Sequence, residues 1–239
     1  MRLGISHSWN VSPHQAARIQ EDLARKVILK HPASPFTTIA AGDVAYARGD
    51  ERIFAVVLLF TYPGLILLES ASAASKVSFQ YIPGLFSFRE APVLLKAFSR
   101  LKTKPDLILV EGQGIAHPRS LGIASHLGLI LDVPSIGCAK SRLFGDSREP
   151  GPERGSRTPL LSGWEEIGAV LRTRTGVKPV FVSPGHKIDL ETSVAIVLST
   201  SRGYRLPEPL RLAHIQANRR RKEHAERQAG LRTDRRDRV

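Results

Sequence analysis

Apolar residues in the first part of the chain recur at helical spacing and then at strand spacing. Between Pro13 and Leu29 they follow a period near 3.6, with charged residues in the gaps, which predicts an amphipathic helix. Three β-rich runs follow, from Phe36 to Tyr46, from Ile53 to Phe60 and from Leu65 to Ser72. Short Gly- and Pro-containing turns separate these runs, so we predict an antiparallel meander.

Helices and strands alternate through the remainder of the chain. A helical period from Glu90 to Leu101 leads into the continuous apolar run 107–110, which predicts a buried strand. A second helix-to-strand step covers 120–130 and 135–139, and a strand-to-helix step covers 177–182 and 192–198. Three antiparallel strands followed by this alternation predict an α/β fold, with a mixed sheet and helices on both of its faces.

Two segments have little apolar content. Residues 144–163 are rich in Gly, Pro, Ser and Arg, so we expect a loop or a disordered insertion there. Beyond Asn218 the chain holds nine Lys or Arg and four acidic residues, a composition typical of a disordered basic tail. We therefore expect one catalytic domain over residues 1–217 and a tail over 218–239.

The charge balance points to a polyanionic partner. The chain has 35 Lys and Arg against 22 Asp and Glu, a net charge of +13. Nucleic acid is the commonest such partner, because each neutralised phosphate releases counterions, and an anionic membrane is the alternative. The sequence has no apolar run of transmembrane length and no apolar signal-peptide core after Met1, so we expect a cytoplasmic protein that does not bind membranes.

Cys138 is the single cysteine, which excludes an internal disulfide and a zinc site with several cysteine ligands. Its apolar neighbours Ile136, Gly137 and Ala139 favour a buried strand over a reactive thiol. We interpret it as a small apolar core residue.

Two carboxylates interrupt apolar strands. Asp43 lies near the end of the first strand, and Glu111 ends the buried run 107–110 just before Gly112-Gln113-Gly114. Asp43 could instead begin a turn, and Glu111 could be an exposed residue at a strand end. If the two strands are neighbours, these side chains could share one Mg²⁺, which usually binds through one or two carboxylates and a substrate phosphate.

Further polar residues stand at element ends. Glu90 is either a helix cap or, because Pro92 favours a helix start near Ala91, a free residue ahead of the helix. Lys140 follows a buried strand, where a cation could stabilise charge on a phosphate. His214 is either functional or a residue of a helix face, and His117, Arg119 and His186 are either functional or solvated.

The turn Tyr81-Ile82-Pro83-Gly84-Leu85 is apolar and contains an aromatic residue. It could form a corner of the core. It could also act as a wedge, because an aromatic residue and a proline on a stiff turn can enter between base steps.

Together these stretches resemble the endonuclease V family, from about Asp22 to Ala217. The motifs that carry the resemblance are Tyr81-Ile82-Pro83-Gly84, Phe88-Arg89-Glu90, Lys104-Pro105-Asp106, Gly112-Gln113-Gly114, His117-Pro118-Arg119, Leu121-Gly122-Ile123-Ala124-Ser125-His126, Asp132-Val133-Pro134, Ala139-Lys140, Ser183-Pro184-Gly185-His186, and Tyr204-Arg205-Leu206-Pro207-Glu208-Pro209 with Arg211 to His214. The resemblance implies a ribonuclease H-like fold. No oligomer signal stands out in the sequence, so we expect a monomer. The resemblance also implies a Mg²⁺-dependent repair enzyme that cuts DNA at the second phosphodiester bond 3′ to inosine or another deaminated base. The ends would be a 3′-hydroxyl and a 5′-phosphate, and RNA remains an alternative substrate.

The resemblance also implies roles for individual residues. Asp43 and Glu111 would bind Mg²⁺, Glu90 would help to hold the metal or the attacking water, and Lys140 and His214 would support the scissile phosphate. The nucleic acid would contact a wedge led by Tyr81 and a base pocket that includes Gly112; the full set is Tyr81, Ile82, Pro83, Gly84, Gly112, Gly114, His117 and Arg119.

One position departs from the family pattern, which has Asp where this chain has Glu111. The extra methylene lengthens the side chain by about 1.5 Å, and Mg²⁺ tolerates little error in its ligand distances. Three hypotheses remain at this point. The protein is an active, lesion-directed endonuclease whose site has adapted to Glu111, or it binds the lesion and cuts poorly. The third is another phosphoryl-transfer nuclease of the same fold, without dependence on a lesion.

Overall fold

The computed structural model describes residues 4–47 and 49–236, and for residues 229–236 it describes the backbone. Its strands are β1 Thr38–Tyr46, β2 Arg52–Thr61, β3 Leu67–Lys76, β4 Leu107–Val110, β5 Ser135–Ala139, β6 Asp146–Ser147, β7 Arg157–Ser162, β8 Glu165–Leu171 and β9 Val180–His186. Its helices are α1 Pro13–Ala24, α2 Phe86–Phe98, α3 Ile123–Leu131, α4 Leu190–Thr200 and α5 Glu208–Arg236. These elements form the α/β fold that the hydrophobic pattern predicts.

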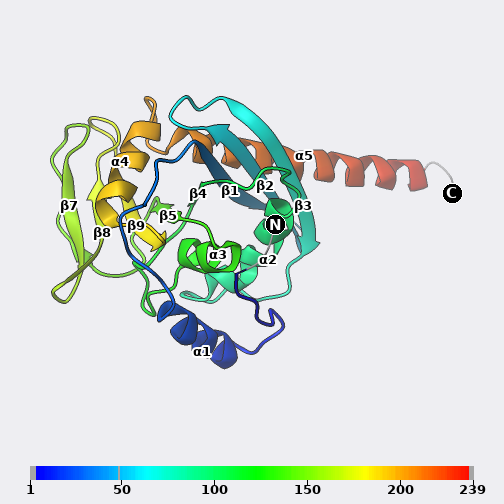
Figure 1. The fold of residues 1–239 in the computed structure, drawn as a ribbon. Helices are drawn as coiled ribbons and strands as arrows, with labels where there is room; N and C mark the ends of the chain where they lie inside the picture. The colour runs from blue at the N-terminus through cyan, green and yellow to red at the C-terminus, as the bar shows by residue number, and fades with distance from the viewer. Residues whose placement is uncertain (1–3, 48, 237–239) are drawn as a thin grey trace.

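The strands form one mixed sheet in the order β3-β2-β1-β4-β5-β9-β8-β7-β6 (Figure 1). The expected meander is confirmed, because β1, β2 and β3 pair antiparallel. β4 pairs parallel with both β1 and β5. The carboxyl ends of these three strands therefore lie at the same edge of the sheet, where α/β proteins commonly bind ligands.

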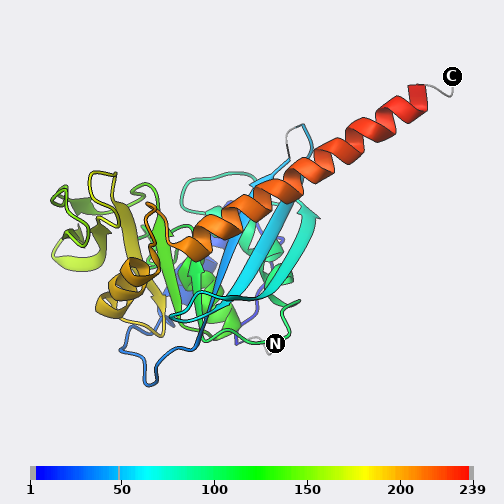
Figure 2. The same cartoon turned by 90° about the horizontal axis from the view of Figure 1, so that it is seen from above.

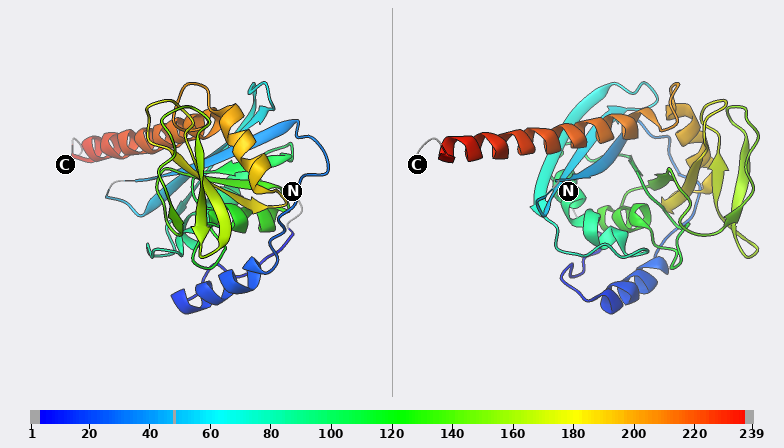
Figure 3. Two further views of the ribbon diagram at one scale, coloured as in Figure 1. Left: turned by 90° about the vertical axis from the view of Figure 1, so that its left-hand side faces the viewer. Right: turned by 180° about the vertical axis from the view of Figure 1, so that it is seen from behind.

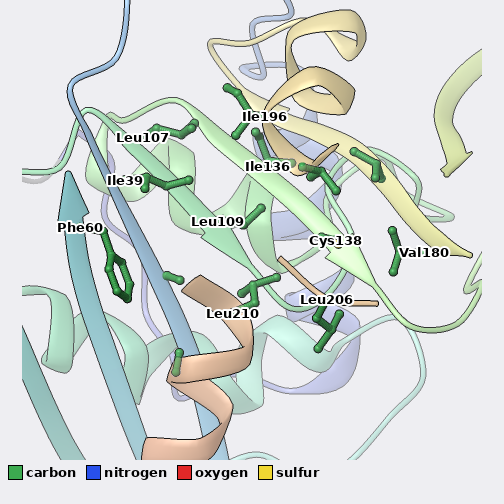
Figure 4. Close-up of a cluster of buried hydrophobic side chains, with 14 of the residues drawn as sticks. Ile39, Phe60, Leu107, Leu109, Ile136, Cys138, Val180, Ile196, Leu206 and Leu210 are labelled. Atoms are coloured by element: carbon green, nitrogen blue, oxygen red, sulfur yellow. The ribbon is translucent and has the colours of Figure 1, made fainter. Parts of the chain in front are cut away.

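Helices cover both faces of the sheet. α2 and α3 pack on one face, whereas α4 and α5 pack on the other, which Figure 3 shows from behind. Figure 4 shows the core on the second face, which includes Leu109 and Ile136 of the central strands, Ile196 of α4 and Leu210 of α5. Cys138 belongs to the same core and is fully buried with a free thiol, as predicted, and burial raises the pKa of that thiol.

The expectation of a loop over residues 144–163 is wrong, because β6 and β7 lie within it and continue the sheet beyond β8. Arg172, only 7% exposed, explains how so polar a segment is ordered. Its guanidinium donates to the backbone carbonyls of Pro150, Gly151 and Val177. These hydrogen bonds hold the segment where apolar side chains are few.

The structure also differs from the expected disordered tail, because α5 continues from Glu208 to Arg236 as one helix. Ala213 and Ala217 are fully buried beneath its first turns. Arg, Lys, Glu, Ala and Gln, which dominate the continuation, are all strong helix formers. Arg219 also pairs with Glu223 one turn later. None of the helices in the described part of the chain is long and apolar enough to cross a membrane.

Candidate active site

Asp43 and Glu111 are brought together by the pairing of β1 with β4. Gly42 lies opposite Val110 in this parallel pair, so Asp43 and Glu111 are the next residues on adjacent strands. β4 ends at Val110, and Glu111 begins the turn that follows. The assumption that the two strands are neighbours in the sheet is therefore confirmed.

His214 reaches the same cluster from α5. Its Nδ1 lies 2.7 Å from Oδ2 of Asp43. The amide nitrogen of Asn218, which can only donate, lies 3.2 Å from Nε2 of His214. Nδ1 therefore carries the proton and donates it to Asp43. One ligand atom each from Asp43, Glu111 and His214 lie within 4.8 Å of one another.

Lys140 pairs with Glu111 across the parallel strands β4 and β5. Its Nζ lies 2.7 Å from Oε1 and 2.9 Å from Oε2 of Glu111. Both side chains are partly exposed, 39% for Lys140 and 23% for Glu111. The ammonium group is thus held at the mouth of the acidic cluster, where a phosphate could meet it.

Glu90 lies inside α2, which corrects both sequence-based interpretations. The helix begins at Phe86, so Glu90 neither caps it nor precedes it, and Pro92 lies within it. The Glu90 side chain is 5% exposed, and its Oε1 accepts a hydrogen bond of 2.8 Å from the hydroxyl of Tyr46. Burial is the main cause that raises the pKa of Glu90 to about 8, and the charges of Asp43 and Glu111 raise it further.

The cluster suits a hard cation. Burial, and next the charge of Glu111, raises the pKa of Asp43, so the negative charge gathered here is poorly compensated by the protein. Asp43 and Glu111 each keep lone pairs beyond those used by His214 and Lys140. Carboxylate oxygens are the ligands that Mg²⁺ prefers. The donor set therefore fits the metal that the resemblance implies.

A cleft of about 400 Å³ opens above the cluster. Asp43, Glu90 and Glu111 line it, together with Tyr81 and Pro83 of the apolar turn. Tyr81 is 66% exposed, so it is not a core corner. Ile82 of the same turn is partly buried and packs instead against the core cluster around Phe79, Leu85 and Phe88.

The turn after Glu111 requires glycine at two positions. Gly112 lines the cleft with φ +142°, and a Cβ there would lie 2.6 Å from Ile123. Gly114 is not among the cleft residues. Its N–H donates to the Ser183 hydroxyl, and a Cβ would lie 2.1 Å from the carbonyl oxygen of Pro184. The turn after Glu111 is therefore packed directly on β9.

His117 and Arg119 hold the Tyr81 turn from behind. Both contact the carbonyl oxygen of Gly84, His117 through Nε2 at 2.9 Å and Arg119 through a guanidinium nitrogen at 2.7 Å. Arg119 also donates to Gln20. Burial lowers the pKa of His117 to about 4, so its ring is neutral at pH 7. These residues are neither free surface groups nor direct members of the acidic cluster.

Tyr46 and Gln113 are site residues that were not predicted from the sequence, and one candidate residue, His186, lies elsewhere. Tyr46 binds Glu90, and Gln113 lines the cleft while its amide donates to the carbonyl of Ser141. No pattern links Tyr46 to Glu90, since only packing of α2 on β1 joins them. His186 is not brought to the cluster, because it is buried beside Asp132 at the other end of the sheet.

Known proteins resemble this chain in sequence and in fold. The family model for endonuclease V matches residues 21–215. Endonuclease V of Methanothrix thermoacetophila is 51% identical over 215 residues, which cover 90% of this chain and 95% of the relative. The crystal structure of endonuclease V from Bacillus subtilis has a TM-score of 0.90 at 30% identity and covers 95% of this chain and 100% of that one. Endonuclease V of Ciona intestinalis, solved in complex with a 23mer DNA containing an inosine followed by a ribo-adenosine, has a TM-score of 0.78 at 26% identity, with coverage of 89% and 99%.

Proposed function

This chain belongs to the endonuclease V family and has its ribonuclease H-like fold, and on that premise we propose that it is a Mg²⁺-dependent repair endonuclease for deaminated bases. It recognises inosine in DNA and hydrolyses the second phosphodiester bond on the 3′ side, leaving a 3′-hydroxyl and a 5′-phosphate. The observation that carries the proposal is that Asp43, Glu90 and Glu111 line one cleft together with Tyr81 and Gly112.

Asp43 and Glu111 would hold the metal, and Glu90 lies close enough for its charge to act on both. Bound Mg²⁺ would polarise a phosphoryl oxygen and make a coordinated water more acidic. The protein contributes the position of its ligands. His214 orients Asp43 through the 2.7 Å hydrogen bond, and Lys140 orients Glu111.

Two further groups would act on the phosphate and the water. The ammonium group of Lys140 would stabilise the negative charge that develops on the phosphate oxygens, and it does so best where water is partly excluded. Glu90 would hold the attacking water through its Oε2, while Oε1 stays bound to Tyr46.

The cleft would take a base that has left the helical stack. Enzymes that act at a single base commonly extrude it into a pocket, and a cleft of about 400 Å³ lined by Gly112 and Gly122 offers one. Tyr81, exposed on a turn that His117 and Arg119 hold in place, would fill the gap left in the duplex.

The alternative of a lesion-binding protein that cuts poorly rests on Glu111. The longer side chain is not displaced from the cluster: it remains within ligand range of Asp43 and is held by Lys140. This geometry favours a site that has adapted to Glu111, so we propose an active nuclease.

A nicking assay tests the proposal. The protein is incubated with paired DNA duplexes that contain inosine or adenine at one position, with Mg²⁺ or with EDTA, and the ends are mapped. We expect nicking of the inosine strand only, and only with Mg²⁺. Equal nicking of both duplexes would replace the lesion-specific proposal with a general nuclease, and a matching RNA pair decides between the two nucleic acids.

A further inference from the structure

α5 continues well past the part of the chain that the family match covers. The match ends at residue 215, whereas the helix runs to Arg236. Figures 1 and 2 show that α5 crosses the sheet over β1 and β2 and then projects beyond the body of the protein. The catalytic role described above uses only His214 of this helix, so the continuation has no function assigned to it.

The first turns of the continuation are docked on the sheet. Nε2 of His224 lies 3.0 Å from Oδ2 of Asp50 in the β1–β2 turn, and its ring lies 5.1 Å from the ring of Phe54 on β2. The His224 side chain is only 13% exposed. The residues around it therefore have a defined position relative to the cleft.

This docked segment is strongly basic. Residues 218–228 contain five Lys or Arg and two Glu. Arg219 and Arg220 share Glu223, at 3.0 and 3.3 Å. Lys222 and Arg227 are exposed and have no ion-pair partner among the side chains that the structure describes. The local charge is therefore not neutralised within the helix.

A second cleft, of about 250 Å³, lies between α5 and the edge strand β3. Arg100, Arg220 and Arg227 line it together with Glu223 and His224. Arg100 comes from the end of α2 and donates to the backbone carbonyl of Ser72 on β3. Guanidinium groups from two separate elements thus converge on one small hollow, an arrangement suited to a phosphate group.

We propose that this surface, formed by residues 218–228 of α5 with Arg100, binds the phosphate backbone of duplex nucleic acid outside the catalytic cleft. A duplex fits better than a membrane, because the segment has no apolar face to insert into lipid. It also fits better than a single strand, because exposed aromatic residues for base stacking are absent from the described segment.

The length of α5 gives the distance between the catalytic cleft and this surface. His214, at the cleft, and Arg227 are thirteen residues apart on one helix, a separation of about 20 Å at 1.5 Å per residue. A duplex that binds parallel to α5 covers this distance in about six base pairs at 3.4 Å each. The proposed function, on which this step rests, puts the cut near His214. The surface would then contact the duplex about six base pairs from the cut.

Binding of an undamaged duplex in EDTA tests the inference separately from cutting. The test variant carries Arg220→Gln, Lys222→Gln and Arg227→Gln. Because each lost phosphate contact removes about 0.9 from the slope of log K against log salt, the slope should fall by up to about 2.7. Affinity at low salt should fall by about tenfold or more. The single-turnover nicking rate of inosine DNA at saturating enzyme should stay unchanged.

A matched control removes the same charge elsewhere. Arg148, Arg174 and Lys178 are exposed residues near the far edge of the sheet, and a triple Gln variant there should leave the slope nearly unchanged. Equal losses in the two variants would show a general effect of net charge and overturn the proposal. So would an unchanged slope in the test variant, or a loss only of binding to vesicles of anionic lipid.

Duplexes with progressively shorter arms give the second readout. The parent should lose affinity when one arm is cut back to less than about six base pairs from the inosine-directed cut, and the test variant should not respond. A parent that is indifferent to the length of both arms would refute the assigned position. A protein that binds duplex in this way and never nicks inosine DNA would sink the proposed function and leave this inference standing.

Discussion

The substitution Glu111→Asp is the most informative single change in the site. It restores the carboxylate length that the family pattern has, at the one position where this chain departs from it. Removing one methylene withdraws the carboxylate by about 1.5 Å. In the structure, Lys140 contacts both oxygens of Glu111 at 2.7 and 2.9 Å, and Glu111 shares the cluster with Asp43. A shorter side chain on the same backbone would lose the contact with Lys140 and its place beside Asp43.

The magnitude follows from these two contacts. The ion pair with Lys140 is partly exposed, so its loss contributes about 1 kcal/mol or less. A displaced metal ligand matters more, because Mg²⁺ requires ligand distances near 2.0–2.1 Å. We expect a fall in the nicking rate of about tenfold or more, equivalent to about 1.4 kcal/mol of transition-state stabilisation. The Mg²⁺ concentration for half-maximal rate should rise as well.

Single-turnover nicking of inosine DNA, titrated with Mg²⁺, measures both effects. Glu111→Gln is the matched control, because it keeps the length of the side chain and removes the charge. It should lose more activity than Glu111→Asp and respond less to added metal. Melting curves in EDTA confirm that all three proteins are folded. If Glu111→Asp equals or exceeds the parent at every Mg²⁺ concentration, the site has not adapted to Glu111 and the reasoning fails.

Three other changes probe separate parts of the protein. Asp43→Ala should abolish nicking and leave binding to inosine DNA in EDTA largely intact, since contacts to phosphates do not need the metal; a nicking rate near that of the parent would remove Asp43 from the ligand set. Tyr81→Ala should reduce discrimination between inosine-containing and undamaged duplex in a competition assay, because the exposed ring would offset the loss of stacking; unchanged discrimination would speak against a wedge. Burial lowers the pKa of His126 to about 3, below its ordinary 6.5. Between these two pH values the unfolded protein therefore binds one proton more than the folded protein does. The free energy of unfolding should fall by about 1.4 kcal/mol for each pH unit below 6.5. Melting temperatures in EDTA from neutral to mildly acidic pH should therefore fall more steeply for the parent than for His126→Gln, and parallel curves would contradict this.

The central part of the fold could be predicted from the sequence because its strands are apolar and its turns are short. Leu107 to Val110 and Ser135 to Ala139 occur as strands with the predicted bounds. The prediction that Asp43 and Glu111 lie together followed from a single assumption about which strands are neighbours. The pairing of β1 with β4 confirms that assumption.

The outer part of the fold could not be predicted, because it depends on contacts between distant polar residues. β6 and β7 look like a loop in the sequence, since the group that orders their surroundings is a buried arginine and not an apolar stripe. The continuation of α5 looks disordered for a similar reason. Its docking depends on one histidine that meets Asp50, 174 residues away in the chain.

The arrangement around β1 explains why Glu90 was misplaced and why it nevertheless joins the site. Side chains three residues apart on a strand point to opposite faces of the sheet. Asp43 therefore points to the face covered by α5, where His214 holds it, whereas Tyr46 points to the face covered by α2, where it binds Glu90. A strand at the centre of the sheet can in this way bring side chains from both helical layers to one cleft. Periodicity along α2 alone cannot reveal this, because the partner that keeps a carboxylate buried in that helix belongs to another element.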